Sequence, residues 1–150
     1  MRKLICAFML ALSLPVTMAN MTESKPAANK EDADFVEGKK AIERKDWKAA
    51  VDALSRALPR MPKSADVHNY LGYAHRHLDD LDSSFRHYNE ALRIDPKHRG
   101  AHEYIGEAYL KAGQPEKAAE HLARLEQICG KRCEEYQDLA KSLAAYQKAK

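Results

Sequence analysis

Residues 65–98 read ADVHNYLGYAHRHLDDLDSSFRHYNEALRIDPKH, and this stretch determines the fold class of the chain. It contains two runs of apolar side chains at helical spacing. They are Val67, Leu71, Ala74 and Leu78 in the first run, and Leu81, Phe85, Tyr88, Ala91 and Leu92 in the second. Asp79-Asp80 separates the runs as a polar turn, and Pro96 ends the second run because proline disfavours helical geometry in the residue before it. The stretch therefore predicts two antiparallel helices, over residues 65–78 and 82–93.

The same pattern occurs once before this stretch and once after it, at a constant interval and without a gap. Gly72 aligns with Gly38 and Gly106, and small or apolar residues agree at three further places. These triplets are Ala50, Ser84 and Ala118; Leu54, Tyr88 and Leu122; and Ala57, Ala91 and Leu125. A fixed period of about 34 residues indicates stacked copies of one helical hairpin. We expect repeats at about 31–64, 65–98 and 99–132, with further helices over 33–44, 48–60, 99–112 and 115–128.

Two of the copies carry a recognisable set of residues. The middle copy has Tyr70-Leu71-Gly72, Phe85, Tyr88, Ala91-Leu92 and Asp95-Pro96, and the third has Ile105-Gly106, Ala108-Tyr109, Gly113, Ala118 and Leu122. Over about residues 31–132 the chain resembles the tetratricopeptide repeat family. The first copy departs from the pattern, with Glu37 where the later copies have Leu71 and Ile105. The resemblance implies an all-α fold, an α-solenoid of three helical hairpins.

The residues after the third copy predict one more helix, over 133–148. Its apolar side chains lie on one face, and its charged side chains lie on the other. The apolar ones are Tyr136, Leu139, Ala140, Leu143 and Tyr146. A stack of repeats needs such a helix to cover its last apolar surface, so we expect a C-terminal capping helix and a repeat domain spanning 33–148.

The N-terminal residues predict an export signal. Arg2 and Lys3 precede an apolar run from Leu4 to Val16, and small residues surround a cleavage point between Ala19 and Asn20. This run is clearly shorter than the roughly 20 residues that a membrane span needs. We therefore expect a signal peptide over 1–19, a flexible linker over 20–32, and an exported protein, periplasmic or secreted, with no stable membrane insertion after cleavage.

Composition and motifs argue against two functional classes. The formal net charge is +3, and Lys and Arg alternate with Asp and Glu, so the basic stripe of a nucleic-acid-binding protein is missing. No nucleophile elbow, phosphate-binding loop or pair of suitably spaced carboxylates stands out. We expect no catalytic residues, no cofactor and no nucleic-acid partner.

Cys129 and Cys133 lie on either side of Gly130-Lys131-Arg132, between the last repeat and the cap. Gly130 suits the left-handed turn that ends a helix, and a turn of this length brings two Cα atoms within disulfide range. We expect a structural bridge in an oxidising compartment. Redox chemistry, with Lys131 and Arg132 lowering a thiol pKa, and metal binding are the alternatives.

Seven histidines raise the question of a metal site. His98 and His102 are four positions apart, as zinc ligands on a helix are. A tetrahedral site needs further ligands that the sequence does not specify. We expect no metal site, with the histidines at the surface or between helices.

In the family that the chain resembles, the first helix of each hairpin lines a concave groove that binds an extended peptide or a helix. Transferred by repeat phase, the groove residues are Lys39, Glu43, Asn69, Tyr73, Arg76, His77, Glu103, Glu107 and Lys111. The chaperone-binding branch of the family clamps a C-terminal carboxylate with basic and amide side chains. Several of those places hold Phe35, Tyr70, Gly100 and Tyr104 here, which disfavours that ligand.

The resemblance therefore implies a non-enzymatic adaptor that holds a protein or peptide partner in its groove. The alternative, from a different class, is a small thiol-redox or metal-handling protein of the periplasm. That protein would act through Cys129, Cys133 and the histidines.

Overall fold

The computed structural model describes residues 31–149, which contain seven α-helices and no strand. The helices are α1 (Ala33–Glu43), α2 (Trp47–Ala57), α3 (Ala65–His77), α4 (Leu81–Ile94), α5 (Arg99–Lys111), α6 (Pro115–Cys129) and α7 (Glu134–Lys148). The all-α fold of three helical hairpins and a final helix is as the sequence predicts. The expected signal peptide, its cleavage site and the expected linker up to residue 30 lie outside the described residues.

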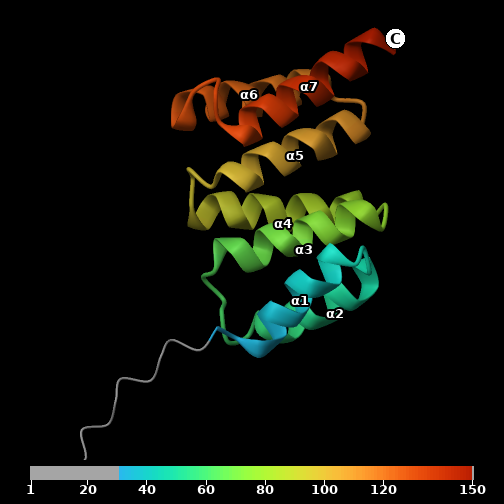
Figure 1. The fold of residues 1–150 in the computed structure, drawn as a ribbon, viewed down its shortest axis with the longest axis vertical. Coiled ribbons are helices and arrows are strands. Elements are labelled where there is room, and N and C mark those ends of the chain that lie inside the picture. Colours follow the sequence, from blue (N-terminus) through green and yellow to red (C-terminus); the bar gives the residue numbers. More distant parts are fainter. Residues whose placement is uncertain (1–30, 150) are drawn as a thin grey trace, which may run out of the picture. The chain divides into compact units, whose positions relative to one another are not determined.

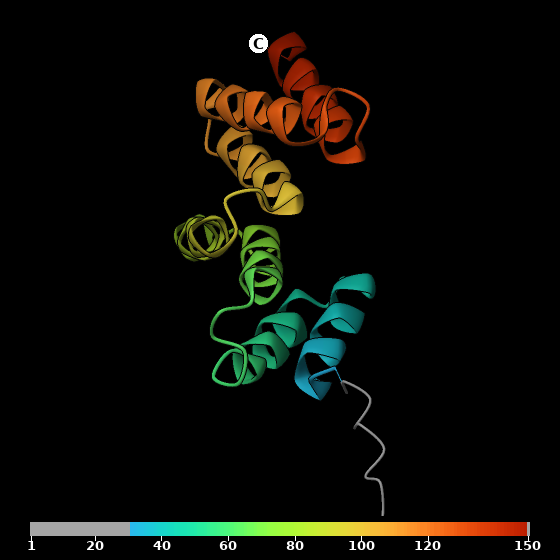
Figure 2. The same cartoon turned by 90° about the vertical axis from the view of Figure 1, so that its left-hand side faces the viewer.

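The seven helices follow one another in a stack, from α1 and α2 at one end to α6 and α7 at the other (Figure 1). The first helices of the hairpins form an inner row, because α1 contacts α3, α3 contacts α5 and α5 contacts α7. Within residues 31–149, the second helices α2, α4 and α6 make no such contacts with one another. Figure 2 shows them on the opposite side of the stack from the inner row. This asymmetry gives the inner row a surface of its own.

The recurring glycines explain why the hairpins close so tightly. A Cβ at Gly72 would lie 2.7 Å from two ring carbons of Tyr88, and one at Gly38 would lie 2.5 Å from Leu54. In the third repeat the neighbour changes. A Cβ at Gly106 would meet Leu139 of α7 at 2.6 Å, so the capping helix fills the place that the second helix fills in the earlier repeats.

The turns between paired helices are also repeated. Lys45, Asp79 and Gly113 occupy the same place in successive repeats, and all three have a positive φ, of 59°, 63° and 73°. In the first two repeats the next residue, Asp46 or Asp80, caps the second helix by accepting a backbone N–H of its first turn. A side-chain oxygen at this place satisfies an amide that the helix itself leaves unpaired. Local chemistry thus sets the course of the chain into each second helix.

Two boundaries differ from the expected ones in an informative way. The second helix ends at Ala57 rather than 60, because the chain continues from Leu58 as turns in which Met61 donates to the carbonyls of Ala57 and Leu58. Asp32, the last residue of the expected linker, is the N-cap of α1 and accepts two bonds from Arg60, at 2.6 and 2.9 Å. The Arg60 guanidinium holds the pKa of Asp32 at about 2. No helix within residues 31–149 is long and apolar enough to cross a bilayer.

Candidate functional site

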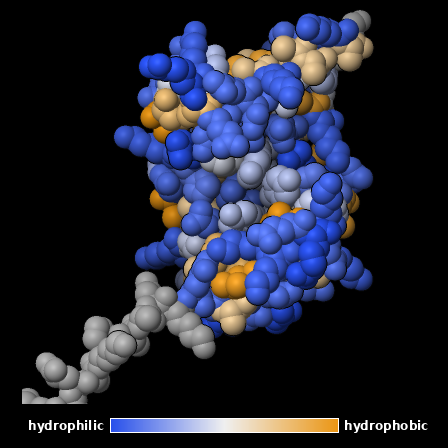
Figure 3. All heavy atoms as spheres, in the orientation of Figure 1, coloured by the Kyte–Doolittle hydropathy of each residue, from blue (hydrophilic) through white to orange (hydrophobic). Residues whose placement is uncertain are grey.

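The inner row of α1, α3, α5 and α7 carries all nine residues expected to line a groove. Figure 3 shows this side of the molecule, with a paler, less hydrophilic area over the middle of the stack and strongly hydrophilic side chains around it. We call this surface the groove. A cavity of about 430 Å³ opens on it between α3, α5 and α7, lined by Arg76, Glu107, Lys111, Ser142 and Tyr146, among others.

Aromatic rings form the middle of the groove. Tyr73 of α3 lies with its ring centroid 4.8 Å from that of Tyr104 and 4.6 Å from that of His77. Trp47, the first residue of α2, stacks on His77 with a centroid separation of 4.1 Å and meets Tyr73 edge-on at 5.9 Å. The sequence prediction included Tyr73 and His77 but missed Trp47 and Tyr104. Trp47 lies at the turn into a second helix, a position that repeat phase does not assign to the groove.

Ion pairs connect the groove cations to carboxylates on neighbouring helices. Arg76 of α3 and Glu107 of α5 lie 2.7 Å apart, and Ser142 of α7 also donates to Glu107. Lys111 donates to the backbone carbonyl of Arg76 at 3.0 Å and pairs with Asp79. The structure therefore brings Arg76, Glu107 and Lys111 together.

Asn69 and Glu103, which are equivalent positions of two repeats, are more enclosed than a groove lining requires. Asn69 is 4% exposed and its Oδ1 has no hydrogen-bond partner. Glu103 is 9% exposed and makes no hydrogen bond or ion pair with any residue between 31 and 149. Burial raises the pKa of Glu103 to about 8, and the nearby carboxylate of Glu107 is the next largest cause.

The two expected groove residues of α1 stand apart from this cluster. Lys39 pairs with Glu31 at 2.5 Å and lies over the ring of Phe35, 4.8 Å from its centroid. Glu43 is exposed and has no hydrogen bond or ion pair within the described chain. The binding roles of all nine residues stay predictions.

The cysteines lie where α6 meets α7. Their Sγ atoms are in bonding contact, and their Cα atoms are 5.9 Å apart, a separation that a disulfide bond spans.

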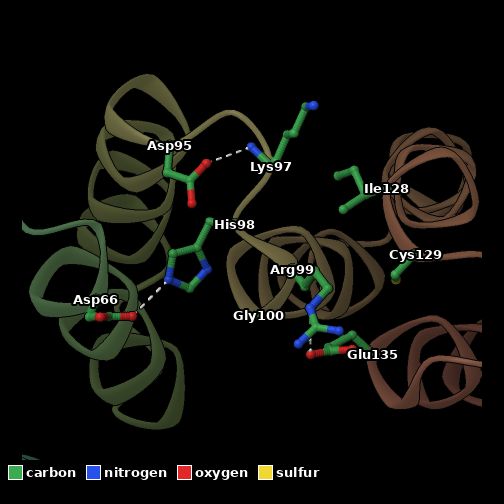
Figure 4. Close-up of a pocket in the computed structure, with 9 residues that line it drawn as sticks. All are labelled: Asp66, Asp95, Lys97, His98, Arg99, Gly100, Ile128, Cys129 and Glu135. Carbon is green, nitrogen blue, oxygen red and sulfur yellow. Dashed lines mark hydrogen bonds and ion pairs between the residues drawn. The ribbon is translucent and has the colours of Figure 1, made fainter.

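A cavity of about 580 Å³ lies beside Cys129 (Figure 4). Arg99 and Glu135 meet across it at 3.3 Å, and His98 contacts Asp66 at 3.0 Å. Ligand atoms of Cys129, Cys133 and Glu135 lie within 4.8 Å of one another, so two reduced thiolates and one carboxylate there would offer three ligands to a metal ion. The bridge and its alternatives remain predictions.

Four of the seven histidines form two pairs, and each pair joins the two helices of its own hairpin. His68 of α3 contacts His87 of α4, and His102 of α5 contacts His121 of α6. His98 instead caps α5, accepting the Ala101 N–H. None of these histidines belongs to a group of three or more metal-ligating side chains within the described residues.

Two family models, both described as tetratricopeptide repeat, match residues 35–99 and 76–143. Together they span α1 through most of α7. The chain belongs to the tetratricopeptide repeat family. The second match continues past the third repeat into the capping helix, in agreement with the contact between Gly106 and Leu139.

Curated relatives of the tetratricopeptide repeat family share part of their length with this chain. The small glutamine-rich tetratricopeptide repeat-containing protein 2 of Saccharomyces cerevisiae is 27% identical over 108 residues, which are 72% of this chain and 31% of the relative. The protein of the same name in Mycosarcoma maydis is 31% identical over 84 residues, 56% of this chain and 24% of that one. This chain thus spans less than a third of the length of either relative.

Solved structures show the same tetratricopeptide repeat fold. The TPR2B domain of yeast Sti1, in its complex with pHsp70, superposes with a TM-score of 0.71 at 18% identity, covering 78% of this chain and 95% of that one. The first such domain of Spaghetti (RPAP3), bound to the HSP90 peptide SRMEEVD, gives a TM-score of 0.67 at 17% identity, with coverage of 76% and 93%. At this level of identity the likeness establishes the fold.

Proposed function

We propose that this protein is a non-enzymatic adaptor that holds a segment of a partner protein in the groove of its inner helices. The observation that carries the proposal is the aromatic cluster of Trp47, Tyr73, His77 and Tyr104. These rings pack against one another, and His77 is exposed while the other three are half-buried. Tyrosine and tryptophan supply large contact areas at low entropic cost, and they are enriched among residues that dominate binding energy.

The polar surroundings of the cluster support the same function. Arg76 and Glu107 fix each other's position on facing helices, so a partner meets side chains that are already ordered. Two of the solved structures with this fold are complexes, one with pHsp70 and one with an HSP90 peptide. A binding role on the inner face is in keeping with these likenesses.

We also propose that the protein works outside the cytoplasm, because residues 1–19 have the pattern of a cleaved export signal. Mass spectrometry of the protein purified from a cell-envelope fraction tests this directly. A mature N-terminus at Asn20 is the expected result. Retention of Met1 on protein found only in the cytosol would disprove export.

Site-specific photo-crosslinking tests the adaptor function. A photoreactive phenylalanine replaces Tyr73 in the groove or, as the matched control, Arg93 on the outer helix α4. In cells that produce the protein, we expect discrete adducts from position 73 and weaker or no adducts from position 93. The adducts should disappear when Trp47→Ala is added. Equal crosslinking from both positions, or none from the groove, would refute the proposal.

A further inference from the structure

The charges in the groove do not balance, and this imbalance indicates the chemistry of the partner. Each cation expected in the groove already has a carboxylate partner. The pairs are Lys39 with Glu31, Arg76 with Glu107, and Lys111 with Asp79. Arg99, at the edge of the groove, pairs with Glu135.

By contrast, Glu103 of α5 and Asp138 of α7 have no hydrogen bond or ion pair within residues 31–149. The unmatched charges are therefore negative.

Glu103 is the more unusual of the two, because a glutamate residue that is only 9% exposed normally has a hydrogen-bond partner for its carboxylate. The charged groups that face it are Glu107 on its own helix, Arg76 from α3, and Glu135 and Asp138 from α7. Arg76 is the one cation among them, and it is held by Glu107 at 2.7 Å. Ionising Glu103 without a further cation is therefore unfavourable.

A second unpaired acceptor lies at the equivalent place of the preceding repeat. Asn69 is almost fully buried, and its Oδ1 makes no hydrogen bond. Gly100 lies beside it, because a Cβ added there would sit 3.4 Å from Asn69 Nδ2 and 3.5 Å from the ring of His98. Two successive inner helices thus present acceptors that lack a donor.

We propose that the partner inserts a lysine or arginine side chain into the groove between α3, α5 and α7, where it pairs with Glu103 and Asp138. This inference rests on the proposed adaptor function and specifies the partner that the groove selects. The cation supplies the missing positive charge, and its N–H groups supply donors to the unpaired acceptors of Glu103 and Asn69. The rings of Tyr73 and Tyr104 lie beside this place and suit the stem or head of a cationic side chain.

The same features exclude an acidic segment. A carboxylate in this part of the groove would face Glu103, Glu107 and Asp138 at close range, and like charges across an interface are strongly unfavourable. The positions that hold basic and amide groups in carboxylate-binding members of the family hold Phe35, Tyr70, Gly100 and Tyr104 here. The partner segment is therefore basic at the position that enters the site.

A phage-displayed library of random peptides, selected on the purified protein, provides the test. The expected outcome is enrichment of peptides that share one lysine or arginine. Replacing that residue with methionine should weaken binding at least about tenfold, as removal of one partner of an enclosed charge pair does. Glu103→Gln should cause a comparable loss, whereas Glu120→Gln, an exposed position on the outer helix α6, should leave affinity unchanged.

The pH dependence of binding separates a charge pair from a merely structural role. Protons compete with the cation for Glu103, whose pKa is about 8 in the free protein, so affinity should fall by up to about tenfold for each pH unit below 8. Glu103→Gln should remove this slope.

Two results would overturn the inference in distinguishable ways. Peptides that need Tyr73 but carry no common cation, and bind Glu103→Gln as well as the wild type, would refute the basic partner and leave the adaptor function standing. Failure of the wild type to select any peptide whose binding depends on Tyr73 would refute both.

Discussion

The Nδ1 atoms of His102 and His121 lie 2.9 Å apart, and the Nε2 atom of His102 lies 3.1 Å from the carbonyl oxygen of Pro96. Because a carbonyl only accepts, Nε2 of His102 carries a proton, and in the neutral ring its Nδ1 is the acceptor. Nδ1 of His121 must then be the donor. His68 and His87 repeat the arrangement one repeat earlier, with Nδ1 atoms 3.1 Å apart. Each contact needs one Nδ1 without a proton, so the two rings of a pair cannot both be protonated.

This requirement predicts a loss of stability in acid. Burial, reinforced by the neighbouring His68 or His102, lowers the pKa of His87 and of His121 from 6.5 to about 4. The pKa in the folded state lies below that in the unfolded state, so stability is full above pH 6.5 and declines as pH falls towards 4. Because solvent partly screens these rings, urea denaturation at pH 7 and pH 5 should differ by roughly 1–3 kcal/mol for the two pairs together.

A double variant provides the control for the histidine pairs. His87→Gln with His121→Gln keeps a side-chain donor at each place but removes the titrating group, so we expect it to lose less than half as much stability between pH 7 and pH 5. His98→Asn, which keeps an N-cap acceptor outside the pairs, should behave as the wild type does. An unchanged pH dependence in the double variant would contradict the assignment.

The helix crossing at Gly72 predicts a cost for a single methyl group. In Gly72→Ala the new Cβ would lie 2.7 Å from the ring of Tyr88, which is itself fully buried and has no room to move. Overpacking of this kind costs about 1–3 kcal/mol in the free energy of unfolding. Gly100→Ala is the matched control, because its nearest neighbour lies at 3.4 Å and alanine favours a helix by about 0.5–1 kcal/mol. Equal stability of the two variants would argue against the close crossing.

The raised pKa of Glu103 predicts that folding stability falls as pH rises, which is the opposite of the effect expected from the histidine pairs. The pKa of Glu103 is raised from 4.5 to about 8 in the folded protein. Its contribution to the stability of the fold is therefore complete below pH 4.5 and is lost as pH rises through 8. Glu103→Gln avoids this loss because the amide stays neutral. We expect the variant to gain roughly 2–4 kcal/mol relative to the wild type between pH 5 and pH 9, measured by urea denaturation. A difference that does not change with pH would show that the carboxyl is solvated.

The proximity of Cys129 and Cys133 predicts a bridge of modest thermodynamic effect. Closing so short a loop restricts the unfolded chain by about 2 kcal/mol. Mass spectrometry of the isolated protein should give a mass two hydrogens below that of the reduced chain, and a reductant should lower the melting temperature. The double variant Cys129→Ser with Cys133→Ser should have the melting temperature of the reduced wild type, and the reductant should not change it. Rapid exchange with small thiols at unchanged stability would instead favour the thiol-handling alternative.

The fold was predictable from the sequence because one constant period carries the same local signals three times. The apolar spacing, the polar turn at Asp79-Asp80 and the glycine at the crossing each specify part of the hairpin, and repetition removes chance matches. The capping helix was predictable for the same reason, since its apolar face has no other place to pack.

The sequence predicts which helix faces form the groove, but it does not predict which side chains contact one another there. Repeat phase assigns Tyr73 and Glu103 to the inner surface, yet it does not show that Trp47 reaches across from a second helix to stack on His77. It also does not reveal that Glu103 lacks a partner, because that depends on the positions of α3 and α7 around it. The histidine pairs share this limit. Each pair joins two helices of one hairpin, and only the crossing angle decides that the rings meet.

The outer helices α2, α4 and α6 do not touch one another, whereas the inner helices form a continuous row. Each outer helix packs instead against the inner helix that follows it, α2 on α3, α4 on α5 and α6 on α7, so every joint of the stack includes an outer helix. Small rotations at successive joints add along a stack of repeats, so the packing at these joints sets its curvature. For the proposed adaptor, we expect substitutions at these joints to change the width of the groove without unfolding any hairpin.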